Sequence, residues 1–170
     1  MNYIDQLAKE HSRANTDLIA KMVGNDPAEF EKIIDIIFKE NAPIPQRASW
    51  LLQIVPKAHP ELIKPYIKLF IDTVRSFKVD GIKRGMLFSL TLQNIPKNLQ
   101  AKALDICFEF MLSPNEAVAV KVYAMELASN ITKQHPELKN ELLAVIEDQL
   151  PKNTVAFSAR ARKVLKKTNG

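Results

Sequence analysis

The chain repeats itself, and this self-similarity restricts its fold more than any other feature of the sequence. The tetrapeptide His-Pro-Glu-Leu occurs at residues 59–62 and again at 135–138, a separation of 76 residues. A basic residue followed by a small or apolar one recurs with steps of 37, 37 and 39 residues, at Arg47-Ala48, Arg84-Gly85, Lys121-Val122 and Arg160-Ala161. These landmarks indicate a unit of about 38 residues, and a fixed period of this size is typical of solenoids and other repeat arrays.

A unit of this length holds two helices of ordinary size and two short connections. Helices are favoured over strands because 46% of the residues are hydrophobic and only four are glycine, while alternating apolar and polar runs are few. Prolines at first-turn positions mark where several helices begin. We predict first helices at Pro27–Lys39, Pro60–Ser76, Leu99–Leu112 and Pro136–Leu150, and second helices at Ile44–Lys57, Gly81–Ile95, Asn115–Lys133 and Thr154–Lys167.

The predicted second helices each carry one apolar stripe. Residues such as Ile44, Ala48 and Leu51 are spaced by three and four positions, which is the pattern of a helix face that packs into a core. A small residue in the stripe, such as Gly85, predicts the close approach of a neighbouring helix. Pro65 lies inside a predicted helix, so it should kink that helix or delay its start.

Together the units predict one all-α domain over residues 1–170, a right-handed α-α superhelix of about four helical pairs. One or two helices within Tyr3–Val23 are expected to cap the array, with Asn15 or Thr16 as an N-cap and a left-handed turn at Gly24-Asn25. The expected organisation is a cap at residues 1–25 and repeats at about 26–58, 59–96, 97–134 and 135–170.

A turn followed by Arg or Lys and then by small and apolar residues resembles the HEAT-like, armadillo-type α-solenoid repeat. The resemblance covers nearly the whole chain and is carried by the four basic landmarks at 47, 84, 121 and 160. The stretches around Arg47-Ala48-Ser49-Trp50, 118–121 and 159–165 are also similar to a group of small bacterial HEAT-like proteins, some labelled adenylosuccinate lyase. That activity is not expected, because the chain lacks the Met-Pro-x-Lys-x-Asn signature loop of the fumarase-like lyases. The resemblance implies that the second helices line a concave side.

Sequence motifs for catalysis are absent. There is no phosphate-binding loop, His-Glu-x-x-His or Cys-x-x-Cys pattern, so we predict no enzyme activity, no catalytic residue, no metal and no cofactor. Cys107 lies in an apolar run and is expected to be buried and reduced, which fits a cytoplasmic protein. No apolar stretch approaches the roughly 18 residues of a membrane span and no leader pattern opens the sequence, so no membrane association is expected.

The candidate binding residues are the basic landmarks and their neighbours on the second helices. The four basic landmarks at 47, 84, 121 and 160 form a basic row, for which two interpretations stay open. Their side chains either tie neighbouring units together or bind a ligand. The only tryptophan either fills the groove between units or is exposed at a binding site. The candidates are Arg47, Trp50, Lys83, Arg84, Lys121, Arg160 and Arg162.

The charge distribution suggests an acidic partner. The net charge is +5, and residues 151–170 alone carry six basic and no acidic side chains. We expect a non-catalytic protein-interaction or scaffold module whose basic concave face binds an acidic or extended segment of another protein. The alternative is a nucleic-acid-binding or DNA-alkylation-repair-like HEAT protein, although Glu126 and a single tryptophan match such repair enzymes poorly. Nucleic-acid binding is expected to be weak, because residues 101–150 carry a net charge of −4 and no row of aromatic side chains is expected.

Overall fold

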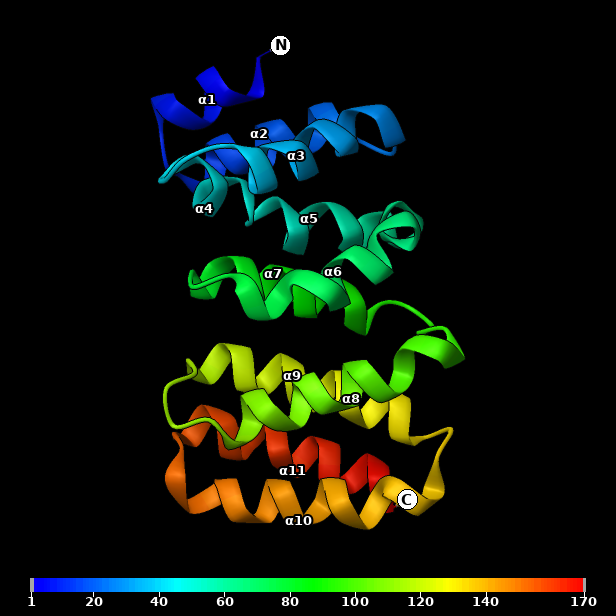
Figure 1. Cartoon of the computed structure of the whole chain (residues 1–170). Helices are drawn as coiled ribbons and strands as arrows, with labels where there is room; N and C mark the ends of the chain where they lie inside the picture. The colour runs from blue at the N-terminus through cyan, green and yellow to red at the C-terminus, as the bar shows by residue number, and fades with distance from the viewer. Residues whose placement is uncertain (1, 170) are drawn as a thin grey trace.

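The computed structural model describes residues 2–169, a range that contains helices and no strands (Figure 1). Short 3-10 helices are η1 (Pro60–Tyr66), η2 (Val74–Ser76), η3 (Pro136–Leu138) and η4 (Leu150–Lys152). The α-helices are α1 (Tyr3–Lys9), α2 (Arg13–Val23), α3 (Pro27–Lys39), α4 (Ile44–Ala48), α5 (Leu51–Ala58), α6 (Ile67–Thr73), α7 (Asp80–Thr91), α8 (Lys97–Leu112), α9 (Val118–Thr132), α10 (Lys139–Gln149) and α11 (Val155–Asn169). The all-α prediction is therefore confirmed. Across the described range, none of the helices combines the length and the apolar character that crossing a lipid bilayer requires.

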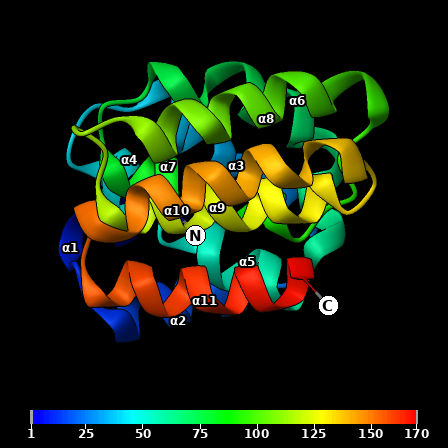
Figure 2. The ribbon, with the colours of Figure 1, turned by 90° about the horizontal axis from the view of Figure 1, so that it is seen from below.

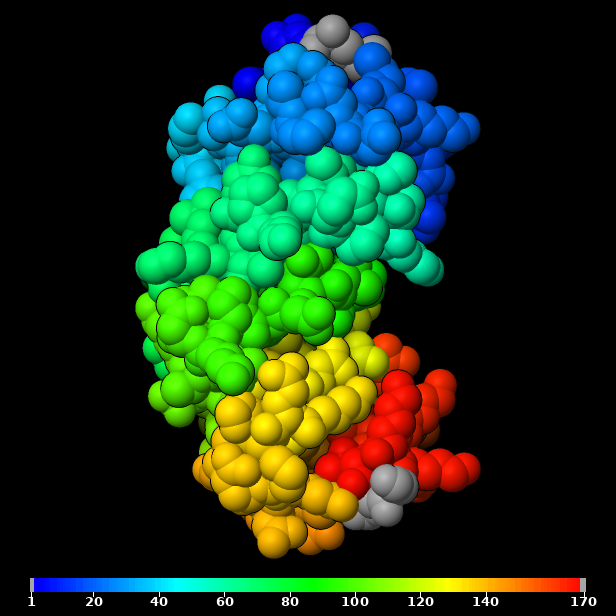
Figure 3. Space-filling model, turned by 90° about the vertical axis from the view of Figure 1, so that its right-hand side faces the viewer, coloured from blue at the N-terminus to red at the C-terminus, as the bar shows by residue number. Residues whose placement is uncertain are grey.

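The helices form a curved stack of two layers. The first helix of each unit (α3, α6, α8 and α10) lies in front in Figure 1, and the second helices lie behind them. Seen along the stack in Figure 2, the first helices α3 and α10 are set back from the first helices α6 and α8, and the second helices α2 and α11 are set back from α7 and α9, so the stack bends. Figure 3 shows the resulting hollow on the second-helix side, between the blue-to-cyan and the red ends of the chain. The second helices therefore line the concave side, as the resemblance implies.

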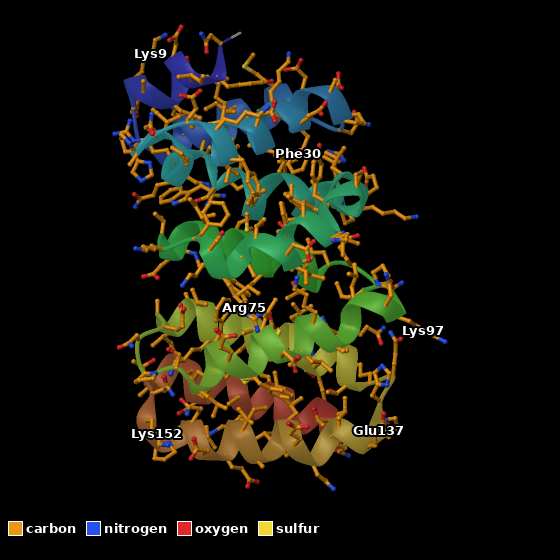
Figure 4. The ribbon with its side chains drawn as sticks, viewed as in Figure 1. Lys9, Phe30, Arg75, Lys97, Glu137 and Lys152 are labelled. Atoms are coloured by element: carbon orange, nitrogen blue, oxygen red, sulfur yellow. The ribbon has the colours of Figure 1, made fainter. Side chains whose placement is uncertain are left out.

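Each unit packs on its immediate neighbours. Helix α9, for example, contacts α8 within its own unit and α7 and α11 in the units on either side. The core runs along the stack between the two layers, and its largest fully buried side chains include Phe30, Phe70 and Phe157. Phe30, labelled in Figure 4, contacts the ring of Tyr66 in the next unit, with 6.0 Å between ring centroids. Burial between units therefore stabilises helices whose apolar faces no single unit covers.

The repeated tetrapeptide adopts the same conformation twice. His59 has φ −134° and ψ 67°, and His135 has φ −135° and ψ 74°, so both precede the next 3-10 helix in the same non-helical conformation. The proline that follows opens a 3-10 helix in both units, where its missing N–H costs no hydrogen bond. The separation of 76 residues thus corresponds to a structural repeat of two units.

Most predicted helices are confirmed, and the deviations have local causes. The helix Pro27–Lys39 has the predicted ends, and Asp26 caps it by accepting hydrogen bonds from the backbone N–H groups of Ala28 and Glu29. The helix predicted at Pro60–Ser76 is α-helical only from Ile67, two residues after Pro65, so the predicted delay is confirmed.

Two details of the prediction are wrong. The predicted helix Ile44–Lys57 is split at Ser49, whose hydroxyl donates to the carbonyl of Gln46, and the backbone bonds there shorten to the i−3 pattern. Ser12, and not Asn15 or Thr16, caps α2. Gly24 has a positive φ of +53°, which favours glycine, but its ψ of −131° lies outside the left-handed helical region, so the predicted left-handed turn forms only in part.

Candidate functional site

A strip of polar and aromatic side chains crosses the concave side of the three helices α7, α9 and α11. Members of the strip on one helix are three or four positions apart, so they share a face that points away from the buried stripe. None of them is fully buried. The concave strip consists of Arg84, Phe88 and Thr91 on α7, Tyr123, Glu126 and Asn130 on α9, and Arg160, Lys163 and Lys167 on α11.

Contacts between neighbouring helices make the strip continuous. The rings of Phe88 and Tyr123 pack edge to face with 5.5 Å between their centroids. The side-chain amide of Asn130 donates to the carbonyl of Thr91 at 3.2 Å. A hollow of about 170 Å³ lies among these helices and is lined by Thr91, Glu126, Ser129, Asn130, Val164 and Lys167.

Two arginines of the concave strip retain unused hydrogen-bond donors. Arg160 Nη2 pairs with Glu126 Oε1 at 2.6 Å, and the arginine side chain is 38% exposed. The Nε atoms of Arg84 and Arg160 are buried and find no hydrogen-bond partner within residues 2–169. A partner cannot reach these two buried Nε atoms, but each guanidinium also carries four N–H donors on its Nη atoms, and both side chains are partly exposed, so the Nη donors can meet a carboxylate of a partner.

Trp50 lies between α4 and α5 and is half-buried. Its ring contacts His11, which follows α1, with 4.6 Å between ring centroids and an angle of 59° between the planes. The indole therefore joins the cap to the first unit and also presents surface to solvent, so both interpretations from the sequence apply to it in part.

Arg47 ties the cap to the first unit. Its Nη1 donates to the carbonyls of Leu7 at 2.8 Å and Ala8 at 3.2 Å, which belong to the last turn of α1. Those carbonyls have no partner within their own helix, and a cation at a helix C-terminus also complements the helix dipole. The contacts of Arg47 therefore agree with the interpretation that the basic row ties neighbouring units together.

Lys83 and Lys121 point toward the loops at the edge of the stack. Lys83 Nζ pairs with Glu116 Oε1 at 2.7 Å and lies 5.3 Å from the ring centroid of Phe110. Lys121 is only 4% exposed, and its Nζ donates to Gln149 Oε1 at 3.2 Å. Burial lowers the pKa of Lys121, and nearby Lys152 lowers it further, while Glu116 opposes them. The remaining candidate, Arg162, is exposed on α11.

The concave strip contains two aromatic side chains that the sequence did not predict. We expected no row of aromatic side chains, but Phe88 on α7 and Tyr123 on α9 pack against each other on the concave side. Phe88 and Tyr123 are 35 positions apart, which does not match the repeat steps of 37 to 39 residues, so the period did not align them. A signal was available in the spacing of Arg84 and Phe88, four positions apart on one helix.

The two layers differ in charge. Helix α1, the first helices α3, α6, α8 and α10, and the four 3-10 turns together carry ten Lys and Arg residues and twelve carboxylates. The second helices α2, α4, α5, α7, α9 and α11 carry twelve Lys and Arg residues and three carboxylates, Asp17, Asp80 and Glu126. The net charge of −4 over residues 101–150 concealed this difference, because that segment contains α8 and α10 of one layer and α9 of the other.

Side chains that could perform redox or metal chemistry are not gathered anywhere in the described range. Cys107 is fully buried in α8, and burial raises the pKa of its thiol. Among residues 2–169, no three His, Cys, Asp or Glu side chains come together in a group that could hold a metal ion.

Comparison with known proteins gives one match. No curated protein and no solved structure matches the chain. The HEAT repeat domain family matches residues 3–168, which is almost the full sequence. Repeats of this family generally mediate protein interaction. The stacked helical pairs, the His-Pro repeat and this match agree, and the chain belongs to the HEAT repeat domain family.

Proposed function

We propose that the protein is a non-catalytic interaction module that holds an acidic, extended segment of another protein along its concave side. The observation that carries the proposal is the difference between the layers: twelve cations and three carboxylates on the second helices, against ten cations and twelve carboxylates on α1, the first helices and the 3-10 turns. Two of the three carboxylates already have cationic partners, since Asp17 pairs with Arg13 and Glu126 with Arg160. A segment rich in Asp and Glu complements the surplus.

The dimensions of the stack suit an extended peptide. Packed helices are about 10 Å apart, so the five rows formed by α2, α5, α7, α9 and α11 span about 40 Å. An extended segment of about 12 residues covers this distance at roughly 3.3 Å per residue. Aromatic or aliphatic side chains of the segment would contact Phe88 and Tyr123, while its carboxylates would meet the Nη donors of Arg84.

A binding assay with matched charge reversals tests the proposal. The probe is a fluorescein-labelled 12-residue peptide of Glu, Asp and Phe, and its counterpart has Lys in place of the acids. On the concave side, the double variant Lys163→Glu and Lys167→Glu should raise the Kd at least tenfold in fluorescence anisotropy. On the outer layer, Lys64→Glu and Lys97→Glu make the same change in net charge at exposed positions and should alter the Kd less than twofold.

The results separate groove binding from general attraction. Equal losses in the two double variants would show that net charge alone attracts the peptide, and so would equal binding of the basic peptide. Rising salt should weaken binding of the acidic peptide to the wild-type protein, because the interaction is partly exposed.

Nucleic-acid binding is the second candidate function. The cations of the second helices favour it because they attract phosphates, and the side chains of Trp50, Phe88 and Tyr123 favour it because aromatic rings stack on bases. Anisotropy titrations of duplex and single-stranded oligonucleotides at about 50 and 200 mM salt test this candidate. Sub-micromolar, sequence-dependent binding at the higher salt would place it ahead of the acidic peptide.

A further inference from the structure

A second groove lies away from the concave strip, at the edge of the stack. It has a volume of about 700 Å³ and lies where α8 turns into α9 and where α10 turns into α11. Figure 4 marks this edge with the label of Lys152. Its walls include the apolar Leu112, Pro114 and Val118. A groove of this size accommodates a small organic molecule or the end of a peptide.

Lys121 supplies a buried positive charge to the groove. The side chain is 4% exposed, and its ammonium donates to the neutral amide oxygen of Gln149 at 3.2 Å. Gln149 is itself held in place, because Asn153 Nδ2 donates to the same oxygen at 3.1 Å and Gln149 Nε2 donates to Asp148 at 3.0 Å. An ammonium has three donors, and an amide oxygen leaves its charge unbalanced.

The carboxylates near Lys121 are already paired with other lysines. Glu116, on the loop between α8 and α9, pairs with Lys83 at 2.7 Å. Asp148, at the end of α10, pairs with Lys152 at 3.0 Å. Because each of these carboxylates is paired with its own lysine, one positive charge, that of Lys121, is left over at the groove.

Helix ends add to the positive potential. Val118 and Thr154, which line the groove, stand at the N-terminal ends of α9 and α11. No side chain caps the first turn of α9. Free N–H groups and the positive end of the helix dipole both favour an anion at such a position.

We propose that this groove binds a carboxylate attached to an apolar group, with the carboxylate at Lys121 Nζ and the apolar group against Leu112, Pro114 and Val118. A single surplus charge matches a monoanion, whereas a phosphate monoester carries about −1.5 to −2 near neutral pH. The carboxylate comes from a small organic acid or from the C-terminus of a polypeptide, since both present the same chemistry.

Calorimetric titration with defined probes tests this site. Hexanoate is the small acid, and hexanamide is its uncharged control. A pentapeptide ending in leucine, with a free or an amidated C-terminus, represents the polypeptide. Hexanoate should bind at least tenfold more tightly than hexanamide, and the free peptide at least tenfold more tightly than the amide. Tighter binding of hexanoate would identify a small organic acid as the ligand, and tighter binding of the free peptide would identify the C-terminus of a polypeptide.

Matched variants locate the binding. Lys121→Met, which removes the charge and keeps an unbranched side chain, should weaken carboxylate binding at least tenfold. Lys78→Gln, which removes an exposed cation in the loop before α7 and outside the lining of the groove, should change it less than threefold. The concave double variant Lys163→Glu and Lys167→Glu should leave hexanoate binding unchanged, so this site can fail while the proposed function stands.

A measurement on the wild-type protein makes the test independent of how well a variant folds. Carboxylate binding should weaken at least tenfold as the pH rises through the lowered pKa of Lys121, and the backbone amide NMR signals of Gln149 and Asn153 should shift on titration with hexanoate. Equal binding of hexanoate and hexanamide, undiminished binding by Lys121→Met, or NMR shifts confined to the concave strip would overturn the inference.

Discussion

Gly85 sets how closely α7 approaches the preceding unit, and replacing it with alanine tests the packing between units. A Cβ atom at this position would lie 2.9 Å from the carbonyl oxygen of Ser49 and 3.0 Å from Cβ of Leu52. The first of these neighbours is backbone and cannot rotate away. The interface around it is also fixed by Ser89, whose hydroxyl donates to the carbonyls of Leu52 and Gly85, both at 2.9 Å.

The expected loss of stability follows from two opposing effects. Alanine is more favourable than glycine inside a helix by about 0.8 to 1.0 kcal/mol. Forcing an extra methyl group into a close-packed interface costs about 1 to 3 kcal/mol. Taking the middle of each range, Gly85→Ala should lower the free energy of unfolding by about 1 kcal/mol, which corresponds to a Tm decrease of about 2 to 4 °C for a chain of this size.

Gly81 is a matched control on the same helix. A Cβ atom at Gly81 would lie 3.4 Å from the rotatable hydroxyl of Ser49, an ordinary contact. Gly81→Ala should therefore raise the free energy of unfolding by about 0.5 kcal/mol through helix propensity alone. Urea unfolding followed by circular dichroism at 222 nm measures both variants. If Gly85→Ala proves as stable as Gly81→Ala, the close approach of α7 to Ser49 is not the feature that requires glycine.

Three further predictions concern side chains described above. Trp50→Ala should lower the free energy of unfolding by about 1 to 2 kcal/mol in urea titrations, because the indole is only half-buried; a loss of about 3 to 5 kcal/mol would indicate full packing between units. Cys107 should resist Ellman's reagent until the chain unfolds, since the thiol is fully buried and its pKa is raised; rapid labelling of the native protein would contradict this. Burial lowers the pKa of Lys121, so the unfolded chain keeps this proton to a higher pH than the folded protein does. Stability should therefore rise with pH between the lowered and the ordinary pKa of lysine, and Lys121→Met should remove its share of that rise in urea unfolding between about pH 7 and 10.

The fold could be predicted because its determinants are local and repeated. First-turn prolines, apolar spacing and the His-Pro-Glu-Leu repeat each specify a helix boundary or a buried face within one unit. The exceptions arise where a side chain competes with the backbone, as at Ser49, or where several capping residues are close together, as at Ser12 and Asn15.

The contacts of the basic row could not be predicted in the same way. Arg47 bonds carbonyls 39 and 40 residues away, whereas Lys121 bonds an amide 28 residues away. Equivalent positions in the repeat therefore meet different partners, because the partners lie in loops and helix ends whose sequences do not repeat. The same reason explains why the groove at Lys121 had no signal in the sequence.

The contact of each unit with its immediate neighbours alone has a mechanical consequence. The bend of the stack is the accumulated result of small rotations at successive interfaces, and within residues 2–169 the main helix contacts join only the same or adjacent units, so an error at one interface is carried along the stack. An added methyl group at the α5–α7 interface therefore tilts the units on its two sides relative to each other. A slight tilt there is multiplied along the stack to α11, so residues that touch no ligand can set the separation of the two ends of the hollow.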